Sequence, residues 1–465
     1  MIYYYIVGRN IEGKIYMRNY NLEVPISKNN EALVKDNNRC ITCGHCKKIC
    51  TNVITVAKRF KVDSKHEPIC LECGQCANIC PTEAIKEKFE YLKVKKILEN
   101  KKDKVIIFNI APAVRVALGE EFNFDPGTNV ESKIPTALKK LGADYVFDIT
   151  FGADLTIMEE ATELVDRIEN NKKLPQFTSC CPAWVKFCEI FYPKLIPNLS
   201  SAKSPITMQS TIIKTYFAKK IDKKPDDIIN IVVAPCTAKK AEIKRKKINY
   251  TSWDTNFVLT TRELALLFKE ENIDITKLKD TKFDSPLETG SGAGVIFGAS
   301  GGVCEAALRT AYYLITKRNL RKENLVFSPI RGMNGIKAAQ VKINKRIIRV
   351  AVCNGMNNAV ELIEKILNKK DYYDFIEVMN CPGGCIAGGG QPKITLLNMK
   401  DTKQKRMNSL YEEDDDMPLR LSHENEEIKA IYKEFLEYPN SPLAKKILHT
   451  KYYDKSSLLG GDNND

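Results

Sequence analysis

The chain has 465 residues, of which 43% are hydrophobic, 28% are charged and 16 are cysteines, and its formal net charge is +14. This length is sufficient for about two to four domains. No stretch of about twenty uncharged apolar residues occurs, so we expect no membrane span. The first residues show no secretory or twin-arginine signal, so we expect a cytoplasmic protein with reduced cysteines rather than an exported disulfide-rich one.

The positive charge includes two lysine-rich runs, at 93–104 and 239–247. No nucleic-acid-binding motif accompanies them, so we expect no nucleic-acid partner and interpret them as solvated surfaces. Such a basic surface can steer an acidic redox protein toward the chain.

Residues 1–33 are rich in tyrosine and asparagine and form a lead segment without a functional motif. Residues 34–88 contain two cysteine runs with the spacing C-x2-C-x2-C-x3-C, made up of Cys40, Cys43, Cys46 and Cys50, and of Cys70, Cys73, Cys76 and Cys80. In two-cluster ferredoxins the fourth cysteine of each run binds the other cluster. The spacing therefore predicts one 4Fe-4S cluster on Cys40, Cys43, Cys46 and Cys80, and a second on Cys70, Cys73, Cys76 and Cys50. Zinc is the alternative ligand.

A lysine-rich helical connector is predicted at 89–104, and the pattern then changes to apolar runs that alternate with amphipathic helices. This alternation is typical of α/β architecture. Buried strands are predicted at 105–108, 145–147, 229–233 and 375–378. Two of them run directly into Cys236 and Cys381, which fits the rule that open α/β sheets bind ligands at the carboxyl ends of their strands.

Three segments in this region, 178–184, 234–240 and 377–392, carry closely spaced cysteines. Together they can supply four thiolates to a third cubane from three separate loops, namely Cys181, Cys236, Cys381 and Cys385. Cys180 and Lys239 are left over beside these ligands, and a purely structural cluster needs neither of them.

An amphipathic helix is predicted from Asp154, its expected N-cap, to Asn170. Glu160, Glu163 and Arg167 form one stripe beside its apolar face. Taken alone, this stripe is typical of a salt-bridged surface. Further along, residues 405–455 are predicted to form a helical segment that begins with the acidic run 412–416, and residues 456–465 a disordered tail.

The three cysteine segments, in this order behind a ferredoxin pattern, resemble the active-site signature of FeFe-hydrogenases, also called iron-only hydrogenases. Residues 419–452 resemble the small-subunit segment of that family, fused in this chain to the large one. The resemblance implies an α/β catalytic domain over 89–404, with two lobes of mainly parallel sheets around the H-cluster. An α+β ferredoxin-like domain with two clusters precedes it.

The resemblance also implies the cofactor and the reaction. The H-cluster is a 4Fe-4S cubane linked through one cysteine, in this chain Cys385, to a diiron site that bears carbon monoxide, cyanide and a bridging dithiolate. The implied reaction is the reversible reduction of protons to dihydrogen. Electrons would come from a ferredoxin or a similar acidic carrier through the two N-terminal clusters, and the diiron site would need maturation proteins. Lys239 would face the cyanide ligands.

The family's proton path matches this chain at Cys180, Glu160, Ser200 and Glu163, with Arg167 at its outer end. The family's cofactor pocket matches at Ala111, Pro112, Pro205, Phe297 and Met379. Histidine is not expected to carry protons, because none of the four histidines, His45, His66, His423 and His449, lies in an active-site motif.

Four positions depart from the family pattern, namely Ala113, Ile206, Ala234 and Cys304, where serine, glutamine and two methionines are usual. They would remove polar contacts and flexible thioethers around the diiron site, which suggests a divergent subgroup. Two alternative functions share this fold. An iron–sulfur assembly protein is disfavoured by the intact Cys180, Lys239 and 388–392, and a hydrogen sensor by the lack of an added signalling domain.

Overall fold

The computed structural model describes residues 7–9, 15–17, 22–59, 67–287, 290–395 and 397–459. Most of the predicted lead segment 1–33 lies outside these residues. Its described parts include β1 (Val7–Arg9) and β2 (Ile15–Met17), which pair in antiparallel fashion.

The ferredoxin-like unit is built from two cysteine loops that each lead into a short helix. Its helices are α1 (His45–Asn52), α2 (Val56–Arg59) and α3 (Gln75–Asn78), and its sheet pairs β3 (Leu33–Lys35) with β4 (Ile85–Glu87) in antiparallel fashion. Gly44 and Gly74 precede α1 and α3 with φ of 81° and 70°, a left-handed conformation that glycine adopts without a Cβ clash. The predicted connector follows as α4 (Tyr91–Glu99).

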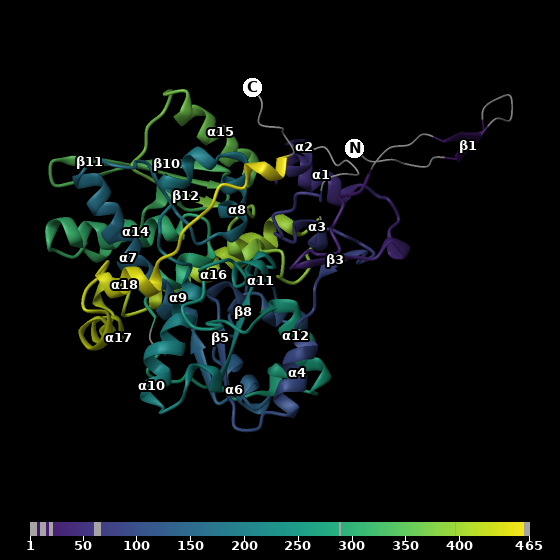
Figure 1. Ribbon diagram of the computed structural model, residues 1–465, viewed down its shortest axis with the longest axis horizontal. Helices are drawn as coiled ribbons and strands as arrows, with labels where there is room; N and C mark the ends of the chain where they lie inside the picture. The colour runs from purple at the N-terminus through teal and green to yellow at the C-terminus, as the bar shows by residue number, and fades with distance from the viewer. Residues whose placement is uncertain are drawn as a thin grey trace.

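The catalytic region has two lobes, each built on a four-stranded sheet (Figure 1). The first sheet is fully parallel and has the order β6 (Tyr145–Asp148), β5 (Val105–Ile110), β8 (Ile228–Ala234) and β9 (Phe257–Thr260). The second has the order β10 (Ile336–Ile343), β11 (Arg346–Asn354), β12 (Phe375–Met379) and β7 (Gln176–Phe177), and only β10 with β11 is antiparallel. The predicted fold class and all four predicted strands are thus confirmed.

Helices cover both sheets, because strands buried on both faces need apolar cover on each side. They are α5 (Pro112–Arg115), α6 (Lys133–Lys140), α7 (Ile149–Glu169), α8 (Pro182–Phe191), α9 (Pro205–Ile212), α10 (Ala218–Lys220), α11 (Ala238–Glu242), α12 (Thr261–Glu270), α13 (Gly292–Val295), α14 (Gly302–Thr316) and α15 (Met356–Leu367). Among the described residues, no helix is both long enough and apolar enough to cross a membrane.

The helix α7 begins earlier than predicted, and its N-cap is Asp148, whose side chain accepts from the Thr150 amide at 3.0 Å. The prediction of Asp154 as N-cap is therefore wrong. Asp154 is fully buried inside the helix and accepts from Ser291 and Ser422, among other donors. Sequence patterning missed this because the first turns of α7, from Ile149 to Ile157, are buried on every face and so show no amphipathic pattern.

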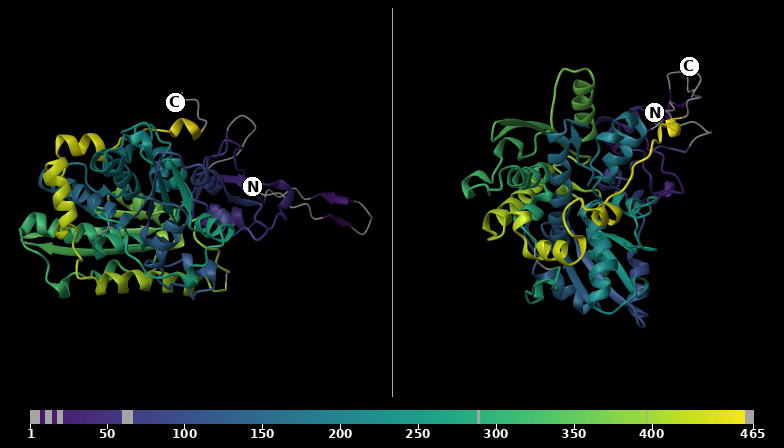
Figure 2. Two further views of the ribbon diagram at one scale, coloured as in Figure 1. Left: turned by 90° about the horizontal axis from the view of Figure 1, so that it is seen from below. Right: turned by 60° about the vertical axis from the view of Figure 1, so that its left-hand side comes forward.

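The C-terminal segment wraps around the catalytic lobes through α16 (Met399–Asp416), α17 (Glu426–Ile431) and α18 (Pro442–Leu448). In the left panel of Figure 2, α16 lies along one side of the molecule, and the chain after α18 then returns across the face (Figure 1). Residues 456–459 form a short 3-10 helix against α8, so the predicted disorder is wrong there. The rest of that tail lies outside the described residues.

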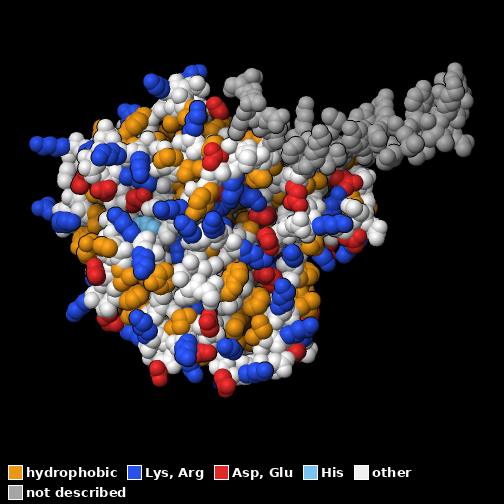
Figure 3. Space-filling view, in the orientation of Figure 1, with side chains coloured by type: hydrophobic (Ala, Val, Ile, Leu, Met, Phe, Trp, Pro, Cys, Tyr) orange, Lys and Arg blue, Asp and Glu red, His pale blue; other side chains and the backbone are white. Residues whose placement is uncertain are grey.

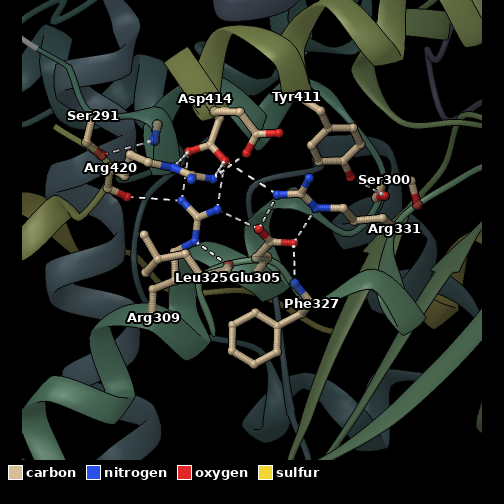
Figure 4. A network of polar contacts seen from close by, with 12 residues as sticks. Ser291, Ser300, Glu305, Arg309, Leu325, Phe327, Arg331, Tyr411, Asp414 and Arg420 are labelled. Atoms are coloured by element: carbon tan, nitrogen blue, oxygen red, sulfur yellow. Dashed lines mark hydrogen bonds and ion pairs between the residues drawn. The ribbon is translucent and has the colours of Figure 1, made fainter. Parts of the chain in front are cut away.

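The acidic run of this segment lies at the end of α16 and not at its start, and one of its carboxylates is fully buried (Figure 4). Asp414 accepts from Arg309 at 2.9 and 2.8 Å and from Arg420 at 2.6 Å, while Arg331 bridges it to Glu305. Burial alone would raise the pKa of Asp414, but Arg309 and Arg420 outweigh it and hold that pKa below its usual range. The network joins α16 to α14 beneath the catalytic lobes.

We expect Asp414→Asn to lower the melting temperature strongly, because Arg309 and Arg331 then share the single charge of Glu305 and Arg420 keeps only the half-exposed Asp415. Removing one partner of a buried ion pair typically costs about 3–5 kcal/mol. The matched control is Asp415→Asn, at a neighbouring and half-exposed carboxylate. Thermal unfolding followed by circular dichroism measures both, and equal melting temperatures for the two variants would contradict the stabilising role of the network.

Candidate active site

The cysteines of the ferredoxin-like unit divide into two groups of four, each around its own cavity. One cavity is lined by Cys40, Cys43, Cys46 and Cys80, and the other by Cys50, Cys70, Cys73 and Cys76. The structure thus brings together the two predicted sets, with the fourth cysteine of each run exchanged. All of these thiols are free.

Burial makes these thiols poor anions in the absence of a cation. It raises the pKa of Cys50 to about 12, with the neighbouring Cys70 as the next cause, and raises the pKa of Cys76 well above its ordinary value. Iron offsets this cost because it binds the thiolate form directly. No three Cys, His, Asp or Glu side chains of the described residues are placed to hold a single metal ion. A cubane makes a different demand, since each of its irons takes its own thiolate.

A third group of thiols lies where the two sheets meet. Its members follow the carboxyl ends of strands: Cys181 comes after β7, Cys236 after β8, and Cys381 and Cys385 after β12. Burial raises the pKa of Cys381 to about 12, and the next causes are Cys181 and Cys385. The pKa of Cys236 is raised in the same way by burial and by Cys381. These thiols raise one another's pKa values, which requires them to lie close together. The structure therefore places the predicted third set in one location.

Gln75 connects the ferredoxin-like unit to this third group. Its Nε2 donates to Cys381 Sγ at 3.1 Å and to the Ala387 carbonyl at 2.8 Å. A Cβ on Gly389 would collide with the Cys73 carbonyl, so the glycine run 388–390 lets the cluster loop approach closely. Sequence reasoning missed Gln75, although its position between Cys73 and Cys76 indicates that its side chain lies near a cluster.

A mainly apolar cavity adjoins the third group. Its lining includes all five predicted pocket residues, the Cys180 and Cys385 thiols, Lys239, and three of the departing positions, Ala113, Ile206 and Ala234. The fourth departing residue, Cys304, is not among the lining residues. Its amide donates instead to the buried Glu377 carboxylate at 2.9 Å. Cys304 packs in the same buried cluster as Phe297 and Met379 of the cavity wall, so its effect on the diiron site stays a prediction.

Lys239 is buried and has its own carboxylate partner. Its Nζ donates to the Cys180 carbonyl at 3.0 Å and pairs with Glu242 Oε2 at 2.7 Å. Burial alone would lower the pKa of Lys239, but Glu242 and the nearby thiols outweigh it and raise that pKa. The side chain is therefore a fixed cation at the cavity wall. Sequence reasoning missed Glu242, three residues further along α11.

The predicted proton-path residues lie in one connected region on the other side of Cys180. Ser200 Oγ donates to Glu163 Oε2 at 3.1 Å, and Glu163 Oε1 pairs with Arg167 at 2.6 Å. Glu160 is fully buried, and neither of its oxygens has a hydrogen-bond partner among the described residues. Burial and the nearby Glu163 raise the pKa of Glu160 to about 8. A carboxyl in this setting is protonated at neutral pH.

Comparison with known proteins identifies the family. Residues 104–389 match the model described as "Iron only hydrogenase large subunit, C-terminal domain", and residues 400–455 match "Iron hydrogenase small subunit". This chain belongs to the iron-only hydrogenases. It is an enzyme of that family, and its cofactors are accessory 4Fe-4S clusters and an H-cluster.

Individual relatives agree with this assignment. The chain is 44% identical to "Iron hydrogenase 1" of Clostridium pasteurianum, over 92% of this chain and 77% of the relative. It is 42% identical to "NADP-reducing hydrogenase subunit HndD" of Solidesulfovibrio fructosivorans, over 92% and 75%. A structure of [FeFe]-hydrogenase HydA1 from Chlamydomonas reinhardtii matches with a TM-score of 0.69 and 38% identity, over 79% of this chain and 99% of that one.

The alternative that this chain is an iron–sulfur assembly protein has weaker support. "Cytosolic Fe-S cluster assembly factor narfl" of Xenopus tropicalis is 28% identical, over 81% of this chain and 80% of the relative. The hydrogenase relatives are markedly more similar to the chain.

We expect the carboxylic-acid carbonyl band of Glu160 to disappear from the infrared spectrum as pH rises through about 8, and not near its ordinary value of 4.5. A raised pKa means that the folded state favours the proton. The contribution of this proton to the free energy of unfolding is thus fully present below pH 4.5 and is lost as pH rises through about 8. Glu160→Gln should lack both the band and this part of the pH dependence. A Glu160 band that vanishes near pH 4.5 would contradict the assignment.

Proposed function

We propose that this enzyme reversibly reduces protons to dihydrogen, with electrons arriving through two 4Fe-4S clusters and protons through Cys180. The observation that carries the proposal is the apolar cavity that adjoins the third thiol group and contains both Cys180 and Lys239. An electron-transfer protein needs neither an apolar cavity nor a buried cation beside its cluster.

Twelve cysteines would hold the cofactors in this proposal. The cavity grouping supports Cys40, Cys43, Cys46 and Cys80 for the first cluster, and Cys70, Cys73, Cys76 and Cys50 for the second. Mutual proximity supports Cys181, Cys236, Cys381 and Cys385 for the cubane of the H-cluster, with Cys385 as the bridge. When bound, the H-cluster supplies the redox chemistry of the reaction. The residues around it position it, exclude water and move protons.

The cavity wall would hold the diiron part of the cofactor by shape and by charge. Ala111, Pro112, Pro205, Phe297 and Met379 give an apolar surface that excludes water. Lys239 is the one cation among the described residues that line this wall, and a buried cation suits anionic cyanide ligands. Because Ala113, Ile206 and Ala234 add no polar side chain to the wall, we propose that the cofactor depends on Lys239 more heavily in this enzyme than in family members with the usual residues.

Protons would pass from Glu163 to Ser200, then to Glu160 and finally to the Cys180 thiol. Burial, followed by the effect of Glu160, raises the pKa of Cys180 well above its ordinary value, so the thiol is neutral and can donate. Ser200 acts to lower the pKa of Glu160, and Glu160 acts to raise the pKa of Cys180, so the three groups lie near one another in the order that the relay requires. Arg167 would hold the outer carboxylate in position.

We expect about fourteen irons per chain in the matured protein, from three four-iron cubanes and one diiron site. The infrared spectrum should show bands of metal-bound carbon monoxide and cyanide, which ferredoxin-type clusters lack. Iron analysis and infrared spectroscopy of the same sample measure both quantities. An iron content of about twelve per chain without these bands would mean that the diiron site is absent, and the proposed reaction would then be wrong.

Electrons would enter at the cluster on Cys40, Cys43, Cys46 and Cys80. The other cluster is the one next to the H-cluster, because Gln75, which lies in its cysteine loop, donates a hydrogen bond to Cys381. The outer cluster reaches the surface beside Ile41, which is 60% exposed. Arg39 and Lys48 are exposed nearby, and the ion pair of Arg39 with Glu83 is long, at 3.9 Å. We therefore place the docking site of an acidic carrier, such as a ferredoxin, over this loop.

The lysine run that the sequence suggested for docking is a weaker candidate. Lys95 pairs with Glu270 and Glu271, and Lys101 pairs with Asp144, so much of its charge is already offset. In Figure 1, α4 lies beside α12 and apart from α1. Figure 3 shows Lys and Arg side chains spread over the whole face and interspersed with Asp and Glu.

We expect Arg39→Glu with Lys48→Glu to raise the Michaelis constant for a reduced ferredoxin and to leave the rate with a small neutral dye donor unchanged. Charge steering acts over about 8–10 Å near physiological salt, so the effect should shrink as salt is added. The matched control is Lys95→Glu with Lys101→Glu. Hydrogen evolution across a salt series measures all of these. A larger effect from the control pair would place docking on α4 instead.

Two points remain predictions. The cytoplasmic location rests on the reduced, cluster-type use of the cysteines. Dependence on maturation proteins follows from the diiron site that the proposal requires.

A further inference from the structure

We propose that His449, together with Ser201 and Glu159, forms a second branch of the proton relay that leaves the outer carboxylate Glu163. The inference rests on the proposed function, because it extends the relay described above. It concerns a histidine that lies far outside every active-site motif in the sequence.

The branch begins at the same oxygen that the relay uses. Glu163 Oε2 accepts from Ser200 Oγ at 3.1 Å and also from Ser201 Oγ at 3.2 Å. Ser201 Oγ in turn lies 2.8 Å from His449 Nδ1. An unbroken chain of hydrogen-bonding atoms therefore leads from Glu163 to an imidazole of the C-terminal segment.

The backbone holds His449 in this position. The Thr450 amide donates to the Ser201 carbonyl at 2.9 Å, and the Lys203 amide donates to the Leu448 carbonyl at 2.9 Å. Ala202 and His449 form a β-bridge between these bonds. The contact of His449 with Ser201 is thus fixed by paired main chains, and not by the packing of one flexible side chain.

A buried carboxylate orients the ring from its other side. Glu159 Oε2 lies 2.9 Å from His449 Nε2, and Glu159 is fully buried. Tyr432 also donates to this carboxylate, and so does the main-chain amide of Asn440 at 2.8 Å. We assign the Nε2–H tautomer, because the Glu159 carboxylate lies 2.9 Å from Nε2, whereas the Asn440 side-chain nitrogen, in the orientation that satisfies its partners, lies 3.1 Å from Nε2 and 2.9 Å from Glu159 Oε2, which accepts from it. Nδ1 is then an acceptor for the Ser201 hydroxyl, whose single proton is donated either to Nδ1 or to Glu163.

This arrangement can move a proton without leaving a charge unpaired. In hydrogen oxidation, protonated Glu163 gives its proton to Ser201 Oγ, and Ser201 gives its own proton to His449 Nδ1. The imidazolium so formed is stabilised by the Glu159 carboxylate, as in serine–histidine–acid constellations. It returns to the neutral Nε2–H form when Nδ1 releases the transferred proton to water at the surface, where the side chain keeps 7% of its exposure. Hydrogen evolution runs these steps backwards.

The sequence alone could not reveal the branch, since Ser201 and His449 are distant in the chain and share no motif. A purely structural role is the competing explanation, in which Glu159 and His449 tie the C-terminal segment to α7. The two explanations differ in what Ser201→Ala should do, because it removes the hydroxyl between Glu163 and the imidazole and leaves the main-chain pairing of the segment in place.

The kinetic test measures hydrogen evolution with a small dye donor in the matured full-length enzyme. Two groups of one branch predict that His449→Ala and Ser201→Ala each remove about half of the rate, and that the double variant loses no more than either single variant. Imidazole in the buffer should restore the rate of His449→Ala and leave the wild type unchanged. A full rate for Ser201→Ala, or no rescue of His449→Ala by imidazole, would overturn the branch.

The controls separate this test from the proposed function. His423→Gln changes a buried histidine of the same segment that contacts Thr310 and Asn319, away from the relay residues, so its rate should match the wild type. Cys180→Ala should block turnover in either case. If the wild-type enzyme shows no hydrogen evolution and no carbon monoxide or cyanide bands, the proposed function fails, whatever His449 does.

A second readout does not depend on activity. Nitrogen NMR of histidine-labelled full-length protein should show the Nε2–H tautomer at His449, with the signal assigned by its loss in His449→Ala. Glu159→Gln should shift this signal and reduce the rate as much as His449→Ala does. An Nδ1–H tautomer, or Glu159→Gln with the full wild-type rate, would contradict proton transfer from Ser201 to the imidazole.

Discussion

Burying four thiolates at one point is the constraint on which the rest of this structure depends. A buried thiol resists ionisation, and its neighbours increase that resistance, as the raised pKa of Cys381 illustrates. A 4Fe-4S cluster removes the penalty only if each of its four irons binds one of the four sulfurs. The chain meets this demand by ending three parallel strands, β7, β8 and β12, at the same place. Because these strands belong to two different sheets, the cubane also fixes how the two lobes sit against each other.

The parts outside the lobes serve the same centre from two sides. The ferredoxin-like unit approaches through Gln75 and through close contact with the glycine run 388–390. On the other side, α16 reaches the lobes through the Asp414 network, and Tyr411 of the same helix donates to the Ser300 carbonyl. Ser300 lies next to the turn that contains Phe297 and Gly298 of the cavity wall. The C-terminal segment is thus part of the support of the active site, and not an added domain.

Much of this could be predicted from the sequence, because thiolate clusters leave short, rigid spacings. The cysteine runs and the strands leading to Cys236 and Cys381 are local signals, and the structure groups the cysteines as the spacing predicts. Residues that depend on distant contacts could not be found in this way. Asp414 lies in an acidic run that looks solvent-exposed, and only the approach of Arg309 and Arg420 shows that it is buried. Asp154 failed as an N-cap for the same reason, since its partners come from other elements.

The separate entry of electrons and protons has a physical consequence at Cys180 and Cys181. These adjacent residues face different tasks, because Cys181 belongs to the thiol group of the cubane while Cys180 lines the neighbouring cavity. An electron that arrives at a buried cluster makes its surroundings more negative, and a more negative environment raises the pKa of a nearby acid. Cys180 and Glu160 already have raised pKa values from burial, so in the proposed relay each arriving electron would draw a proton inward. Lys239 limits this effect on the cavity side, where its fixed charge opposes the added negative charge. Charge balance at a buried site therefore couples the two routes without any moving part.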